Sequence, residues 1–244
     1  MRYETVRAVV LSSRPLGEAD RIVTLFTKEL GRVDAVVKGV RRTKSRWGGR
    51  LEPFVLVDLV LFRGRSLFTV TSAQLVGANP RLREDREAMA AAAVVCEATA
   101  GLFAEGEPEE RAFNLVARAL RELDAGFAGA ALRAPLVLGT FVKLLSEAGY
   151  LPVLDRCASC GATEGLALAF SAARGGLVCE RCLHEGVPAT PAAVTALRQG
   201  LGLPLAELRA LPGGEGVEEA FRLLHALYAY HTGAQLRSLR YARA

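Results

Sequence analysis

The sequence predicts an α+β protein of several domains, with a small β-barrel at the N-terminus and a helical body after it. Three observations lead to this fold class. The first third of the chain contains five short apolar segments separated by turns, the rest is mostly rich in Ala, Glu, Leu and Arg, and two pairs of cysteines interrupt that second part. We expect the barrel at residues 1–80. A helical domain follows in two parts, residues 81–154 and 187–244, and a cysteine-containing insert separates these parts at residues 155–186.

The five N-terminal segments have the β-branched, apolar composition of strands, and most of the turns between them contain Gly or Pro. They cover residues 5–11, 21–27, 32–40, 54–62 and 67–76. Five short strands in about 80 residues favour a small closed barrel. The five-stranded OB-fold is the commonest barrel of this size that binds oligonucleotides. An SH3-like barrel is the alternative.

The remainder of the chain predicts helices, because its apolar residues recur with helical spacing and Gly and Pro cluster between the segments. These helices are expected at residues 82–104, 109–123, 130–148, 191–201 and 217–230, with an extension of the last towards residue 240. The short, Gly-bearing joints between the first three indicate a bundle. We expect the last two helices to pack on the same bundle.

A cationic loop, KGVRRTKSRWGGR, joins the third and fourth predicted strands. It contains six cationic residues and no anionic one: Lys38, Arg41, Arg42, Lys44, Arg46 and Arg50. A loop without internal counter-charge favours an external polyanion, and nucleic acid is the commonest in a cell. The alternative is a solvated loop without a function. Trp47 lies inside the loop, where it either stacks on a base or pins the loop to the barrel.

The charge distribution supports the same interpretation. Residues 1–80 carry 14 Lys and Arg against 7 Asp and Glu, whereas residues 81–244 carry 17 against 19. The excess of positive charge therefore belongs to the barrel, which favours a module that binds a polyanion. No signal peptide or apolar run of the roughly 20 residues needed to span a bilayer is visible. We expect a cytoplasmic, nucleoid-associated protein without membrane contact.

The cysteine pairs CASC and CERC predict a metal site. Eighteen residues separate the pair Cys157 and Cys160 from the pair Cys179 and Cys182, a spacing that allows two knuckles to close on one ion. Four thiolates complete a tetrahedral shell that suits one structural Zn²⁺. His184 is a spare donor that such a shell does not need. The fifth cysteine, Cys96, falls inside a predicted helix and is expected to be a core residue.

The motifs of several enzyme classes are absent. The chain contains no P-loop motif, no HExxH motif and no cluster of Asp residues suited to a two-metal nuclease. We therefore expect no enzymatic activity.

The order of several short motifs resembles one known family. GEAD, RIVTLFT, KGVRR and LEPF follow one another as in the N-terminal domain of the RecO family of bacterial recombination mediators, and the CxxC pairs resemble its zinc-bearing members. The matching positions are Gly17, Glu18, Asp20, Thr27, Gly31, Lys38, Gly39 and Ser45. The resemblance implies an OB-fold, a helical domain, a zinc ribbon and no catalytic activity.

The resemblance also implies partners. Members of the family bind single- and double-stranded DNA, anneal complementary strands, and act with RecR to load RecA onto strands coated by the single-stranded DNA-binding protein SSB. The six cations of the loop and Trp47 are then the candidate DNA contacts. The first alternative is that the chain is an RNA-binding or transcription-associated adaptor, built from an OB-fold and a zinc ribbon. The second is that it is a protein scaffold that binds no nucleic acid.

Overall fold

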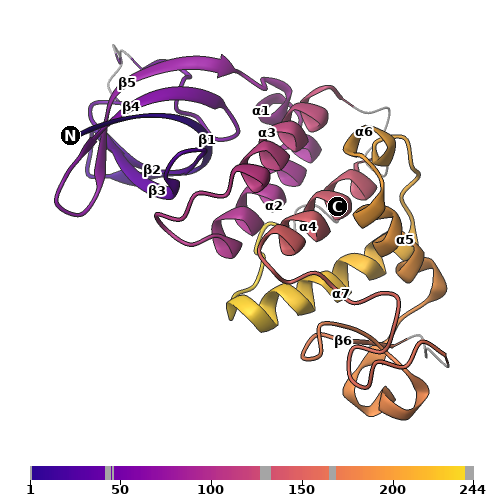
Figure 1. Cartoon of the computed structure of the whole chain (residues 1–244). Helices are drawn as coiled ribbons and strands as arrows, with labels where there is room; N and C mark the ends of the chain where they lie inside the picture. The colour runs from indigo at the N-terminus through magenta and orange to yellow at the C-terminus, as the bar shows by residue number, and fades with distance from the viewer. Residues whose placement is uncertain (1, 42–44, 46, 127–132, 165–168, 240–244) are drawn as a thin grey trace. The chain divides into compact units, whose positions relative to one another are not determined.

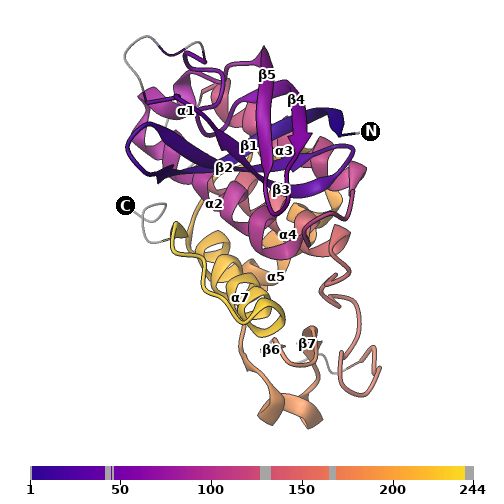
Figure 2. The ribbon, with the colours of Figure 1, turned by 90° about the vertical axis from the view of Figure 1, so that its left-hand side faces the viewer.

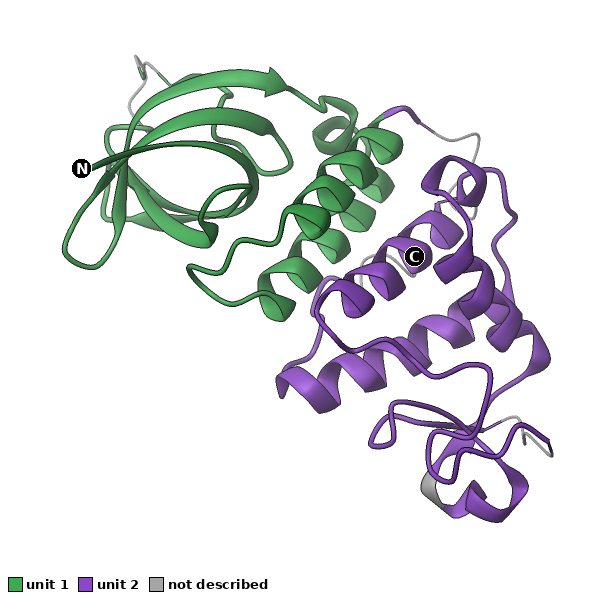
Figure 3. Cartoon of the chain, in the orientation of Figure 1, with its two compact units in different colours: residues 1–124 green, residues 125–244 purple. Residues whose placement is uncertain are grey.

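The computed structural model describes residues 2–41, 45, 47–126, 133–164 and 169–239. The chain divides into two compact units, residues 1–124 and residues 125–244 (Figure 3). The helices predicted at residues 82–104 and 109–123 therefore belong to the same unit as the barrel, whereas the helix predicted at 130–148 and the later helices form a unit with the cysteine segment.

The N-terminal unit begins with a closed five-stranded barrel of the OB type, which confirms the predicted architecture (Figure 1). The strand order around the barrel is β1-β2-β3-β5-β4. All neighbours are antiparallel except β3 and β5, which pair in parallel over two residues. The strands are β1 (Tyr3–Leu16), β2 (Asp20–Thr27), β3 (Gly31–Val37), β4 (Leu56–Arg63) and β5 (Phe68–Gly77).

The barrel core is filled by apolar side chains that occupy every second position along the strands. In β3, for example, Val33, Ala35 and Val37 are buried, whereas the residues between them are partly exposed. Successive side chains of a strand point to opposite faces, so one residue in two enters the core. The buried cluster draws on all five strands and on the loop between β3 and β4, from which Trp47, Leu51 and Val55 join it.

Two strands are shorter than predicted because of positive φ angles. β3 ends at Val37 instead of residue 40, since Gly39 adopts a φ of 67° in the turn that follows. β4 begins at Leu56 instead of residue 54, since Phe54 has a φ of 74°. That unusual backbone is held by hydrogen bonds: Phe54 N donates to Val10 O at 2.8 Å, and Asn79 Nδ2 donates to Phe54 O at 2.7 Å.

The first predicted helix, residues 82–104, is two helices in the structure: α1 (Arg81–Glu84) and α2 (Arg86–Leu102). Asp85 is extended, and its carboxylate accepts hydrogen bonds from Glu87 N and Ala88 N at 2.9 and 3.1 Å. An Asp in this position caps a new helix, which explains the break.

Helix α3 (Glu110–Asp124) follows and packs against α2. Both helices contact the barrel on strand β1, and α2 also contacts β2. Phe26 of β2 is fully buried, and its ring lies 5.2 Å from that of Phe103 and 6.3 Å from that of Phe113. The connection after α2 also crosses β3, because Arg32 Nε donates to Phe103 O and Gly106 N donates to Arg32 O.

The C-terminal unit is built on three helices, α4 (Ala134–Glu147), α5 (Pro191–Gly202) and α7 (Glu215–Thr232), each of which contacts the other two. The short α6 (Leu205–Leu208), which was not predicted, packs on α4. α7 does not extend to residue 240, since it ends at Gly233 with a φ of 67°. The first residues of the helix predicted at 130–148 lie outside the described residues. No helix in the described part of the chain is both long and apolar enough to cross a membrane.

Between α4 and α5 lies the cysteine segment. It contains a three-stranded sheet with the order β7-β6-β8 and a 3₁₀ turn, η2 (Glu180–Glu185). The strands are β6 (Ala169–Ser171), β7 (Gly176–Val178) and β8 (Val187–Pro188). Val153, just before the first cysteine pair, bridges to Gly176 at the start of β7. A side chain at position 176 would meet the Val153 backbone, so the close approach requires glycine.

Candidate nucleic-acid interface and metal centre

The N-terminal end of the cationic loop, which follows β3, is tied to the turn between β1 and β2. Gly39 N donates to the carboxylate of Asp20 at 2.8 Å, and Arg41 N donates to Ala19 O at 3.0 Å. The guanidinium of Arg41 adds a hydrogen bond from Nη1 to Gly17 O at 3.1 Å. The positions that carried the family resemblance in this region therefore hold the two turns together.

Of the six cations predicted to contact DNA, three lie among the described residues, and all three are exposed: Lys38, Arg41 and Arg50. Arg50 Nη1 donates to Trp47 O at 3.3 Å. The other three, Arg42, Lys44 and Arg46, lie outside the described residues. The described cations thus frame the loop at both ends and present positive charge to solvent.

Trp47 is buried, with 4% of its surface exposed, and belongs to the barrel core. Its indole Nε1 donates to Lys38 O at 2.9 Å. Of the two roles considered for Trp47, this arrangement corresponds to pinning the loop to the barrel. Contact between this ring and a base stays a prediction.

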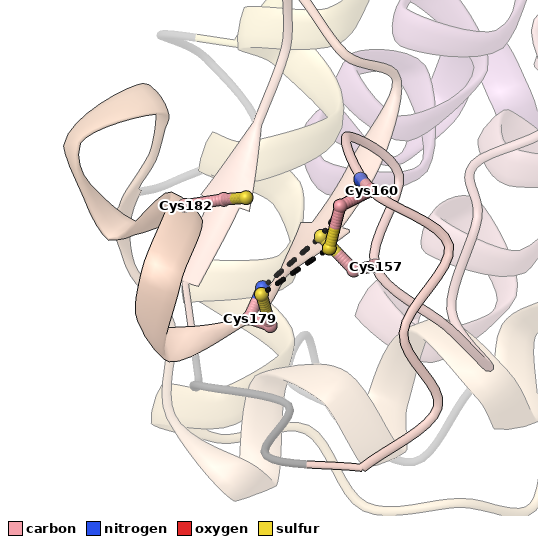
Figure 4. A group of neighbouring side chains, drawn as sticks. All are labelled: Cys157, Cys160, Cys179 and Cys182. Carbon is pink, nitrogen blue, oxygen red and sulfur yellow. Dashed lines mark hydrogen bonds between the residues drawn. The ribbon is translucent and has the colours of Figure 1, made fainter.

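The four predicted metal ligands converge in the C-terminal unit (Figure 4). The Sγ atoms of Cys157, Cys160, Cys179 and Cys182 all lie within 4.8 Å of one another, and those of Cys160 and Cys179 are 3.6 Å apart. A tetrahedral shell with metal–sulfur bonds of about 2.3 Å places its sulfurs about 3.8 Å apart. The donor set and its spacing therefore fit one metal ion.

The backbone around the cysteines stabilises thiolates. Cys157 Sγ accepts hydrogen bonds from the N–H groups of Cys160 and Cys179, at 3.4 and 3.3 Å. Chiefly because of the N–H of Cys160, the pKa of Cys157 falls to about 6. The Ser159 hydroxyl acts to lower the pKa of Cys182, but burial and the other three thiols together raise it to about 12.

Four thiols in this space cannot all ionise without a cation, because each negative charge disfavours the next. A bound dication removes that penalty and takes all four as thiolates. Each CxxC pair also forms a tight turn, as the hydrogen bonds from Gly161 N to Cys157 O and from Cys182 N to Cys179 O show. His184 is exposed and is not among the converging donor atoms.

Cys96 is separate from this cluster. It lies buried in α2, and burial raises the pKa of its thiol to about 12. A neutral, inaccessible thiol of this kind packs like a small apolar residue.

Comparison with known proteins assigns both halves of the chain. The model for the recombination protein O N-terminal domain matches residues 1–79, and the model for the C-terminal domain matches residues 83–240. The chain belongs to the RecO family. Among RecO relatives, the DNA repair protein RecO of Rubrobacter xylanophilus is 39% identical over 88% of this chain and 86% of its own length. That of a Nocardioides species is 41% identical over 96% of both chains.

A more distant RecO, the DNA repair protein RecO of Pelotomaculum thermopropionicum, is 35% identical over 98% of this chain and 93% of its own length. The similarity therefore spans the barrel, the helices and the cysteine segment, and is not confined to one motif.

One group of exposed aromatic residues was missed by the sequence interpretation. Tyr3 is 58% exposed, and its ring packs edge-on against Phe62 at 5.2 Å. The alternation in residues 54–62 could have revealed it, since Phe62 falls on the same face as Asp58 and opposite to the buried Leu59 and Leu61.

Proposed function

We propose that this chain is a DNA-binding mediator of recombinational repair, which binds single and double strands and anneals complementary ones. The observation that supports it best is the cationic loop on an OB-type barrel in a member of the RecO family. The loop is anchored at both ends and presents Lys38, Arg41 and Arg50 to solvent. Phosphate contacts by such side chains dominate nucleic-acid affinity and carry no sequence preference.

Annealing needs a protein that screens the repulsion between two phosphate backbones while leaving the bases free to pair. A solvent-facing loop of Arg and Lys suits this task, because it neutralises phosphates without enclosing the bases. A deep stacking groove would instead retain one strand. The anchored loop fits the first description, since its Trp is buried in the barrel.

The four cysteines are proposed to hold one structural Zn²⁺. Four sulfur donors leave no open coordination position for a substrate or a water molecule, so the ion would stabilise the fold of residues 155–185 and take no part in chemistry. We further propose that the protein is not an enzyme. The cysteine cluster is the one group of potential metal ligands found among the described residues, and it is coordinatively complete.

RecR is the proposed partner for loading RecA onto SSB-coated strands, and the nucleoid is the proposed site of action. These partners follow from the family. The first experiment is therefore a strand-annealing assay with two complementary oligonucleotides, with and without RecR. Faster annealing at low salt, lost as salt increases, supports the proposal. Failure to bind either form of DNA at low salt contradicts it.

A competition experiment with the same protein and oligonucleotides distinguishes this function from the alternative, an RNA-binding adaptor. Structured RNA is added as a competitor to protein bound to single-stranded DNA. A mediator of DNA repair should retain the DNA strand, whereas an RNA-binding adaptor should release it at low competitor concentrations.

A further inference from the structure

A row of two aromatic residues, a threonine and a valine crosses the outer face of the barrel over four neighbouring strands. Tyr3 of β1 pairs with Phe62 of β4, Phe62 pairs with Thr69 of β5, and Thr69 pairs with Val36 of β3. Residues paired across a sheet point to the same face. Tyr3 is exposed and the other three are partly exposed, whereas the next residues along these strands, Leu61, Val70 and Ala35, are buried in the core.

The row connects two cationic regions. Neighbouring strands lie about 4.8 Å apart, so the path from Tyr3 to Val36 along the barrel surface, over β4 and β5, is about 14 Å long. The exposed Lys38 lies two residues beyond Val36, where β3 has ended and the cationic loop begins. Arg63 N donates to Arg2 O at 2.8 Å at the other end of the row, and the hairpin between β4 and β5 adds Arg65. Figure 2 shows β5, β4 and the N-terminus next to one another on this side.

The cations at the Tyr3 end are exposed, and their counter-charge is small. Arg63 contacts Glu4 at 3.7 Å and lies over the ring of Phe68, 5.0 Å from its centroid. Arg2 and Arg65 are exposed and make no side-chain hydrogen bond or ion pair with any residue that the structure describes. Arg2 and Arg63 thus adjoin Tyr3 and Phe62 in the sequence at this end of the barrel, and Glu4 is the carboxylate that contacts Arg63.

The nearest other carboxylates of this face are already paired. Asp58 accepts two hydrogen bonds from Arg7, at 2.7 and 2.9 Å, and Asp34 contacts Arg14 at 3.6 Å. The hydrogen bond from Arg7 also lowers the pKa of Asp58. Arg7 lies on the outer face of β1 like Tyr3, but its charge is compensated.

The outer face of β1 and β2 on the opposite side is not open to a nucleic acid. Helices α2 and α3 cover it, and Phe26 and Ile22, which point outward there, are 0% and 5% exposed. The connection between these helices adds three exposed glutamates, Glu105, Glu107 and Glu109, of which Glu105 bridges to the start of β3. OB-folds commonly bind oligonucleotides across strands 2 and 3 and with the loop between strands 4 and 5. In this protein, helices cover the outer face of β2, and carboxylates lie beside β3. The side formed by β4 and β5 therefore remains as the surface on which a nucleic acid could bind.

We propose that a single DNA strand crosses the barrel along the row Tyr3–Phe62–Thr69–Val36, from the Arg2 and Arg65 end to the cationic loop. Tyr3 stacks on one base, and Arg2, Arg63, Arg65 and Lys38 bind phosphates. The track deepens the proposed function, because it rests on DNA binding and assigns the path of the single strand. The track also predicts a difference between the two forms of DNA. The cationic loop binds the phosphates of single and double strands, whereas Tyr3 stacks only on bases that are unpaired.

Stacking is tested with Tyr3→Leu, which keeps apolar bulk against Phe62 but removes the aromatic face. Affinity for an oligo(dT) of about ten nucleotides, within the ~4–16-nucleotide site size of OB-folds, should fall about 5- to 160-fold. Affinity for a duplex of the same length should stay unchanged, because its bases are already stacked. Tyr3→Phe should restore single-strand binding, and 2-aminopurine in the strand should report stacking with wild type and Tyr3→Phe alone.

The phosphate contacts are tested with the double variant Arg2→Gln, Arg65→Gln. The slope of log affinity against log salt for the single strand should flatten by about 0.7 for each lost contact. Arg7→Gln is the matched control: it removes an arginine from the outer face of β1 that also carries Tyr3, but one already bound to Asp58, and should leave the slope nearly unchanged.

Two results overturn the track. One is wild-type single-strand affinity in Tyr3→Leu together with an unchanged salt slope in the double variant. The other is an equal loss of single-strand and duplex binding in Tyr3→Leu that Tyr3→Phe does not repair. Failure of the proposed function looks different, because then the wild-type protein itself binds neither form of DNA.

Discussion

The indole of Trp47 donates a hydrogen bond to the backbone carbonyl of Lys38, nine residues earlier in the chain, at 2.9 Å. This contact joins the last part of the cationic loop to its first residue. The ring itself lies in the barrel core, so the loop is closed at its base by one buried side chain. The described cations of the loop, Lys38, Arg41 and Arg50, therefore lie close to a part of the loop that is fixed to the barrel.

Trp47→Ala should lower the free energy of unfolding by about 3–5 kcal/mol, since it empties a large site in the core. Trp47→Phe keeps most of the apolar volume but loses the bond to Lys38, which contributes about 0.5–1.5 kcal/mol. Urea denaturation measures both. If Trp47 instead stacks on a base, Trp47→Phe should retain the affinity, and Trp47→Ala should lose about 1–3 kcal/mol of single-strand affinity with little change in stability.

Neutralising Arg41, Arg42 and Lys44 together, each to Gln, should weaken binding to every DNA sequence and form. Each lost phosphate contact should flatten the salt slope by about 0.9 for duplex and about 0.7 for single strands. The measurement is a titration at several salt concentrations. A control of equal charge replaces Arg111, Arg118 and Arg121, which are exposed on α3, by Gln. If the two triple variants behave alike, the effect is one of net charge, and the loop is not the binding site.

The crossing of α4 and α5 gives a prediction of stability that does not involve DNA. A methyl group at Gly139 would meet the side chain of Leu208 and lie 3.1 Å from Gly200 O, whereas one at Gly202 would meet nothing. Gly139→Ala should therefore destabilise by about 1–3 kcal/mol despite the better helix propensity of Ala. Gly202→Ala should gain up to about 1 kcal/mol from that propensity. Thermal unfolding of the two variants should show shifts of opposite sign.

The barrel could be predicted because alternation and turn residues are local signals. The same signals failed where a backbone angle or a cap decided the boundary. Phe54 is apolar and follows a proline, as a first strand residue could, yet its φ is positive because Asn79 and Val10 hold it there. Asp85 sits in a helical composition, and only its capping bonds reveal the break. The division into two units also depends on tertiary packing, which the helical periodicity of the segments does not contain.

The candidate sites differ in the same way. The cysteine cluster was predictable because spacing alone brings two CxxC pairs to one ion. The positive charge of the loop could be predicted from its residues. The burial of Trp47 could not, because the sequence of a loop does not show whether an aromatic side chain faces a base or the core. The row that includes Tyr3 and Val36 depends on the pairing of β4 with β1 and of β5 with β3, which lie far apart in the sequence.

The metal centre leads to the most specific test of the division of labour between the two units. Protein purified without chelator should contain one Zn²⁺ per chain, and Cys157→Ser should release it, because Cys157 Sγ lies at the centre of the hydrogen bonds that join the two pairs. Cys96→Ser is the matched control: it changes a buried thiol outside the cluster and should retain the metal. Elemental analysis of the three proteins measures the difference.

Loss of the metal should loosen residues 155–185 and little else. The segment has short strands of two or three residues and a small buried cluster built around Cys157, Ala169, Val178 and Cys179. We therefore expect a bound ion to supply much of its folding energy, which is on the order of 10 kcal/mol in isolated zinc fingers. The barrel and helices α4, α5 and α7 have apolar cores of their own. Hydrogen exchange should therefore rise in the segment, while helical circular dichroism and DNA affinity stay nearly unchanged. If Cys157→Ser abolishes DNA binding in a protein that keeps its helices, the cysteine segment is part of the surface that binds nucleic acid. The assignment of DNA binding to the barrel alone is then wrong.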